Sequence, residues 1–193
     1  MRRCGQLRSV ALGVAWHVRL LLSVPFRVLA EGLLFVACRR RDLCGVPVLA
    51  FGAGDSEDAW RGVEGALALV NRIDPRRFKR LRSDLRRVVV TPVKTSSFSP
   101  ISRTCYLAER LAATVDIAAV ASTLVHEAVH ARLQSAGLLY KPGLRVRMEV
   151  ICIKEQIAFA ERLTLKDYSK REALLQHLQT GLQRYCERHA GGN

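Results

Sequence analysis

In the stretch Thr123-Leu-Val-His-Glu-Ala-Val-His-Ala-Arg132, two histidines and a glutamate form the pattern His-Glu-x-x-His inside an otherwise apolar segment. Residues four apart stand one turn above each other in a helix, so the imidazoles of His126 and His130 can share one metal ion. A carboxylate beside such an ion can take a proton from the water that the ion activates, and Glu127 is placed for that role. The motif therefore predicts a zinc site on a helix, with Glu127 as its acid–base group.

A helical hairpin is expected around this motif. The first helix is predicted to begin after Asp116, a good N-cap residue, and to end near Ala136, because Gly137 can adopt the left-handed conformation that stops a helix. A second helix, from about Leu144 to Leu163, is indicated by apolar residues at helical spacing. The loop between them is short, so the two helices should pack as an antiparallel pair.

Two acids on the second helix compete to be the third metal ligand. The histidines lie about one and a half to three turns before the end of their helix, so their partner should lie a similar distance into the next one. Glu149 fits this distance, unless it is an ordinary partner of Arg145 or Arg147. Glu155 lies about 9 Å further along the axis and is expected to face solvent or support the site from outside. Cys152, one turn after Glu149, could offer a thiolate, although a buried apolar cysteine is the commoner case.

With uncharged residues at 128, 129 and 131, the motif resembles that of the zincin metallopeptidases, apart from the charged residue at 132. The glycine and third histidine of the metzincin extension do not follow, so the resemblance is to the gluzincin branch, which takes its third ligand from a later acid. It implies that His126, His130 and Glu149 bind zinc and that Glu127 is the general base of peptide-bond hydrolysis. Ile153 stands where that branch usually has a further acid, one turn beyond its ligand glutamate.

Length and composition favour one compact domain. The chain has 193 residues, of which 49% are hydrophobic, enough for a substantial core but too few for a large multidomain protease. Its six cysteines show neither a Cys-x-x-Cys pair nor a regular disulfide framework, which favours a reducing, cytoplasmic location. We expect a zincin-like metal-binding domain over residues 45–193 and an apolar and basic helical extension over residues 1–44.

The N-terminal extension is apolar from Ser9 to Cys38, but Arg19, Pro25 and Glu31 interrupt it. No uninterrupted stretch of about 20 apolar residues is left for a transmembrane helix. Basic residues before the apolar run imitate a secretory signal, yet no cleavage site clearly follows. Two amphipathic helices, from about Gln6 to Ser23 and from Pro25 to Cys38, are expected instead. They would pack on the domain or lie in a membrane interface beside Arg39-Arg-Arg41, giving a peripheral membrane location.

The remaining elements predict an α+β fold that is mostly helical, with a small sheet before the motif helix. A helix up to about Arg72 and another after Asp74-Pro75 each carry an apolar face, and the capping box Ser169-Lys-Arg-Glu172 should begin the last helix. Extended segments are expected at 46–54, as a strand or a loop, and at 88–93, which should end at a sheet edge because of Pro92. After a loop through 96–100, a second strand is expected at 104–108, and a third would follow it and end at Asp116. In zincins the edge strand of such a sheet holds an extended peptide.

A strongly basic segment supports a rival function. Eight basic residues lie between Arg72 and Arg87 against two aspartates, in a chain of net charge +14. Such a helix could bind nucleic acid or anionic lipid, or it could be a solvated face. The rival is a non-catalytic zinc-binding module that uses this basic surface.

The intact Glu127 argues against the rival, because a structural zinc site has no use for an acid there. The peptidase would act on a peptide or protein. Its oxyanion-stabilising residue could equally be any of four side chains: Tyr106, Tyr140, Tyr168 or His177.

Overall fold

The computed structural model describes residues 38–52, 55–114, 116–138, 142–163 and 168–190. The chain divides into two compact units, residues 1–38 and 39–193, and the second holds the sheet and helices described below. The two predicted N-terminal helices fall, apart from Cys38, outside the described residues. Within the described part, every helix is too short or too polar to cross a membrane.

Five strands form one mixed sheet in the order β1-β2-β3-β5-β4. Their bounds are Arg39–Leu43 (β1), Val46–Ala50 (β2), Arg87–Thr91 (β3), Ser97–Ser99 (β4) and Thr104–Ala108 (β5). The central pairs β2–β3 and β3–β5 are parallel, and the outer pairs β1–β2 and β4–β5 are antiparallel. β4 is therefore one edge of the sheet.

The strand β5 was predicted correctly from the sequence, but its two neighbours in the sheet, β3 and β4, were not. β3 is central rather than an edge strand, because its apolar residues are buried and Pro92 follows its end, where no ladder hydrogen bond is lost. Ser97–Ser99 forms β4 where a loop was expected, and Glu109–Ala112 forms the short helix α4 where a third strand was expected. Arg39–Leu43 pairs with β2, so the sheet begins before the domain boundary expected at residue 45.

Two capped helices precede β3. α2 (Glu57–Ile73) begins at Ser56, whose side chain accepts a hydrogen bond from the backbone N–H of Ala59. Asp74 ends α2 and caps α3 (Pro75–Asp84) by accepting from the N–H of Arg77 at 2.9 Å. The predicted dual role of the Asp74-Pro75 step is thus confirmed.

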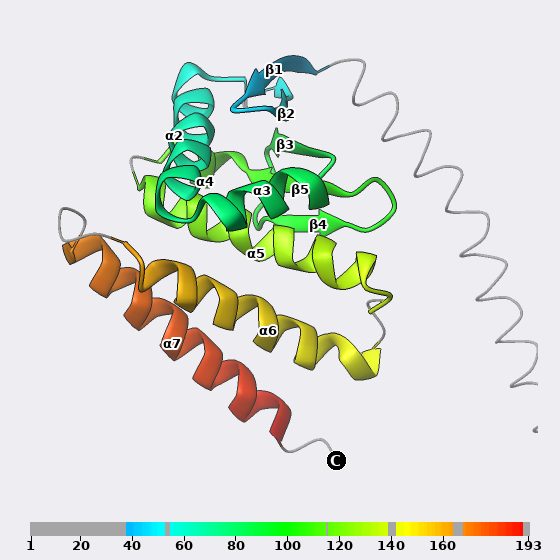
Figure 1. Cartoon of the computed structure of the whole chain (residues 1–193), viewed down its shortest axis with the longest axis vertical. Coiled ribbons are helices and arrows are strands. Elements are labelled where there is room, and N and C mark those ends of the chain that lie inside the picture. The colour runs from blue at the N-terminus through cyan, green and yellow to red at the C-terminus, as the bar shows by residue number, and fades with distance from the viewer. Residues whose placement is uncertain (1–37, 53–54, 115, 139–141, 164–167, 191–193) are drawn as a thin grey trace, which may run out of the picture. The chain divides into compact units, whose positions relative to one another are not determined.

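The helical hairpin also forms as expected. α5 (Ile117–Ser135) is capped by Asp116, and Gly137 follows it with a φ of +82°. α6 spans Pro142–Ala160, and α7 spans Tyr168–Ala190. Ser169 lies inside the first turn of α7 instead of preceding it, so the predicted capping box does not mark the start of that helix. α5 lies against the β4–β5 end of the sheet, α6 packs on α5, and α7 packs on α6 (Figure 1).

The main core lies between the sheet, α2 and α5, and it includes the fully buried side chains of Val63, Val88 and Leu124. Gly62 of α2 faces the backbone of α4, where a Cβ atom would stand 1.8 Å from the carbonyl oxygen of Ala112. α4 lies between β5 and α5 in the chain, so this close approach occurs just before the motif helix. The fold is α+β with a small mixed sheet before the motif helix, as predicted.

Candidate metal centre

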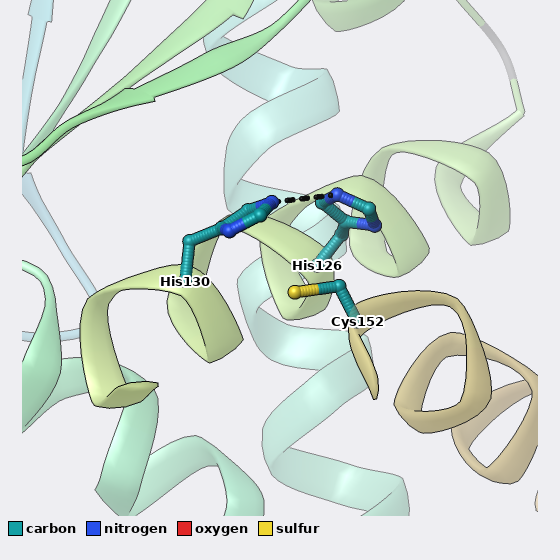
Figure 2. Close-up of side chains that lie close together, drawn as sticks. All are labelled: His126, His130 and Cys152. Atoms are coloured by element: carbon teal, nitrogen blue, oxygen red, sulfur yellow. Dashed lines mark hydrogen bonds between the residues drawn. The ribbon is translucent and has the colours of Figure 1, made fainter. Parts of the chain in front are cut away.

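His126 and His130 come from successive turns of α5, and their rings meet edge to face (Figure 2). Their Nε2 atoms are 3.1 Å apart, so the two nitrogens point to the same place. His130 is 7% exposed, and the neighbouring turns of α5 are buried against the core on the opposite face. The helical spacing of the motif therefore brings the two imidazoles together, as the sequence predicted.

Glu149 reaches the same place from α6. One carboxylate oxygen lies 3.3 Å from Nε2 of His126, and the other lies 3.6 Å from Nε2 of His130. The antiparallel packing of α5 and α6 brings this residue opposite the histidines, at the depth that the hairpin argument requires. Three potential metal donors thus converge from two helices.

Cys152 lies one turn after Glu149, and its sulfur points toward the same histidines (Figure 2). The donor atoms of His126, His130 and Cys152 all lie within 4.8 Å of one another, so this buried group could bind a metal ion. The thiol is fully buried in a small apolar cluster with Val129, Leu133 and Met148. Burial, followed by the charge of Glu149, raises the pKa of the Cys152 thiol well above its usual range. Glu149 and Cys152 are therefore two candidates on α6 for a third metal ligand.

Gln156 orients His126, a role that sequence reasoning missed. Its Oε1 lies 2.8 Å from Nδ1 of His126, while its Nε2 donates to the carbonyl and hydroxyl oxygens of Ser122. Because an amide oxygen can only accept, Nδ1 of His126 must carry the hydrogen of this bond, which leaves the Nε2 lone pair of the neutral imidazole for a metal. Gln156 lies seven residues after Glu149 on one helical face, a spacing that could have identified it.

Glu127 is 5% exposed and lines the same cavity as the histidines. Burial raises the pKa of its carboxyl, and the nearby charge of Glu149 raises it further, whereas the two histidines lower it. The balance is a raised pKa. A carboxylate in such surroundings holds a proton more readily than an exposed one, as a general base requires.

The pKa of His126 is raised above its usual value. Burial lowers it, but the hydrogen bond to Glu149, the charge of Glu127 and the hydrogen bond to Gln156 together outweigh burial. A positive charge is therefore stabilised at this imidazole. The same acceptors and charges would stabilise a cation held beside it.

Glu155 lies away from the histidines. It binds Nη2 of Arg77 at 2.7 Å and Nη2 of Arg132 at 3.0 Å, while Asp74 holds Arg77 at 2.9 Å and Arg162 at 2.8 Å. Burial opposes ionisation of Glu155, but its bonds to the two arginines lower its pKa overall. This partly exposed acid therefore ties α6 to α3 and α5 through ion pairs with two arginines.

The donors open into a cavity of about 660 Å³ between α5, α6 and the strand β4. We call this cavity the groove. Its lining residues are Thr95, Ser96, Ser97, Phe98, Pro100, His126, Glu127, His130, Gln134, Leu138, Arg145, Met148 and Glu149.

Of the four oxyanion candidates, Tyr106 and His177 have described side chains, and neither lines the groove. Tyr140 and the side chain of Tyr168 fall outside the described part.

Comparisons with protein-family models, with curated protein sequences and with solved structures give no match to this chain.

Proposed function

We propose that the chain is a zinc metallopeptidase, with His126, His130 and Glu149 as zinc ligands and Glu127 as general base. One observation carries this proposal. Three donors converge beside a buried carboxylate, inside a groove bordered by the edge strand β4. An acid that is not a ligand but lies next to the ligands is expected of a catalytic site, and a structural site does not need it.

The spacing of the donors suits zinc. Ligand atoms about 2.0–2.1 Å from a tetrahedral ion are separated from each other by about 3.3 Å. The three separations in this site are 3.1, 3.3 and 3.6 Å. Two imidazoles and one carboxylate are also the donor set of catalytic zinc sites that keep a fourth position open.

Glu127 would move the protons of the reaction. Zinc bound by the three ligands would lower the pKa of water and would polarise the substrate carbonyl. Glu127 lines the groove beside both histidines, and its raised pKa suits it to accept a proton from water. It would then pass that proton to the leaving amine, which must be protonated for the peptide bond to break.

The edge strand supports a peptide as the substrate. β4 pairs with β5 on one side, and among the described strands it has no neighbour on the other. Ser97 and Phe98 of β4 line the same groove as the histidines. An extended peptide that paired with this edge would lie along the groove, with its backbone beside the metal site.

The ligand set is tested by metal content. Loss of a residue that supports a metal ligand typically lowers metal affinity by about 10- to 100-fold. Glu149→Gln removes a proposed ligand itself, so it should lower zinc affinity by more than that. Glu155→Gln should leave zinc affinity near that of the parent but lower the free energy of unfolding by about 1–3 kcal/mol, because it breaks a partly exposed ion pair with Arg77. Competition with a chromophoric chelator measures the first quantity, and urea denaturation measures the second.

Cys152→Ser is the matched control on the same helix. It removes the nearby thiol but keeps both histidines and Glu149, so it should retain zinc. Loss of zinc in Cys152→Ser together with retention in Glu149→Gln would make the thiol the third ligand. A parent chain that never acquires zinc would refute the site itself.

The basic surface favours a second candidate, binding to a phosphate-rich partner. On and beside α3, six basic side chains are exposed: Arg72, Arg76, Lys79, Arg80, Arg82 and Arg86. The other two basic residues of this segment contribute less than expected. Arg77 is buried in ion pairs with Asp74 and Glu155, and Arg87 is half-buried in β3.

If this surface binds DNA or anionic vesicles, affinity should fall steeply with salt, because phosphate contacts release counterions. Replacing Arg76, Lys79 and Arg80 with glutamine should weaken the salt dependence. The slope of log affinity against log salt concentration should become shallower by about one for each lost contact to a DNA phosphate. A variant with glutamine at Lys154, Arg184 and Arg188 changes the net charge equally at exposed sites on other helices. Equal weakening by both variants would show that only net charge matters, and the surface would be a solvated face.

A further inference from the structure

The charged side chains of the groove are unevenly distributed. Its two acids, Glu127 and Glu149, stand at the metal centre. Arg145 is the only basic side chain other than the histidines among the described residues that line the groove. The rest of the lining consists of hydroxyl, amide and apolar groups. Among the described lining residues, Arg145 is therefore the basic group that a substrate side chain in the groove would meet beside the metal centre.

Arg145 stands close to the reacting centre. It lies on α6 four residues before Glu149, so the two side chains project from one helical face about 6 Å apart at their Cβ atoms. A peptide extended along β4 advances about 3.3 Å per residue. The side chain one or two residues from the bond held at the metal centre would therefore come within reach of the guanidinium.

We propose that Arg145 forms a subsite for a substrate carboxylate next to the bond that is cut. A guanidinium can bind a carboxylate through two parallel hydrogen bonds, and these charge-assisted bonds are stronger than neutral ones. The carboxylate could belong to an aspartate or glutamate side chain or to the C-terminus of the peptide. A lysine or arginine at this position would face Arg145 and be repelled. This inference rests on the proposed peptidase function, because the subsite is defined relative to the bond that is cut.

The test compares peptides that differ in one charge. Zinc-loaded parent protein is given fluorogenic peptide pools with glutamate, glutamine or lysine at each position around the cleaved bond, with free or amidated C-termini. We expect kcat/KM to be about tenfold higher for glutamate than for glutamine, as for a charge-assisted hydrogen bond at a partly exposed site, and lower still for lysine. An advantage confined to free C-termini would assign the subsite to the terminal carboxylate.

Arg145→Glu should reverse this order and favour lysine. Arg147→Glu is the matched control, because it makes the same change of charge two residues along α6 at an exposed residue that does not line the groove. It should keep the preference of the parent. The preference of the parent should also shrink with added salt, because screening weakens a partly exposed charge pair.

Three outcomes would overturn the inference: a parent without charge preference, a preference that Arg145→Glu leaves unchanged, or loss of zinc from Arg145→Glu. The last would show that Arg145 supports Glu149 and does not contact the substrate. Binding of the same peptides to zinc-loaded Glu127→Gln protein separates this inference from the proposed function. Selective binding of acidic peptides, with no hydrolysis by the parent, would retain the subsite and refute the peptidase.

Discussion

Glu127→Gln should lower the turnover of peptides by about 10² to 10⁴, which corresponds to roughly 3–5 kcal/mol of activation free energy. Glutamine has nearly the same volume, and the substitution leaves His126, His130 and Glu149 in place. The amide cannot accept a proton from water, so the chemical step fails while the ligands stay intact. Zinc content should change little.

The measurement is single-turnover hydrolysis by matched, zinc-loaded samples of the parent and Glu127→Gln. Both samples should show the same metal content and a similar Tm, because the substitution exchanges one buried polar group for another. Equal rates in the two proteins would show that Glu127 is not the base. If both hold zinc tightly and neither cleaves any peptide, the non-catalytic binding module becomes the better explanation.

Gly62→Ala should lower the free energy of unfolding by about 3 kcal/mol or more. The added methyl group would stand 1.8 Å from the carbonyl oxygen of Ala112, a backbone atom that cannot rotate away as a side chain does. α2 and α4 must therefore move apart. Because α4 leads directly into α5, the displacement should reach the helix of His126 and lower zinc affinity as well.

Gly65→Ala is the control on the same helix. Its added methyl group would meet the Cδ1 atom of Ile117 at 3.2 Å, the end of a flexible side chain. Alanine also favours a helix over glycine by about 1 kcal/mol, so the variant should remain within about 1 kcal/mol of the parent. Urea denaturation followed by circular dichroism compares the two variants. Equal stability of Gly62→Ala and the parent would show that α2 and α4 do not approach as closely as described.

The helices were predictable because their signals are local. Asp116 and Gly137 bound α5 at the positions that their capping chemistry demands, and the spacing of His126 and His130 requires only a helix. Glu149 followed from one further assumption, that a short loop makes adjacent helices antiparallel. Each of these inferences joins residues that are near in sequence, so few alternative arrangements compete.

The sheet was harder to predict because its pairing is not local. Val88, Val89 and Val90 are buried on both faces of a central parallel strand, and their partners in β2 are about 40 residues earlier in the chain. Pro92 suggested an edge because a proline within a strand would break a ladder, yet it lies just outside β3. The three-residue strand β4 is too short for any periodicity to reveal.

The role of Gln156 was hidden for a different reason. An amide is an unusual supporting partner for a metal-binding histidine, whereas a carboxylate is a familiar one, so the residue type of Gln156 gives no signal of this role. The neighbouring acid Glu155 has the more familiar residue type, but its contacts are with Arg77 and Arg132. Only the packed hairpin distinguishes which of these neighbouring residues turns toward the histidines.

The neutral amide of Gln156 has a consequence for the charge balance of the centre. With neutral imidazoles, the two ionised carboxylates of Glu127 and Glu149 give the site two negative charges, which one divalent cation neutralises. A carboxylate in place of Gln156 would leave an uncompensated negative charge in a region removed from water, where such a charge is costly. Because the amide orients His126 without adding charge, a divalent ion bound as proposed would leave this interior electrically neutral.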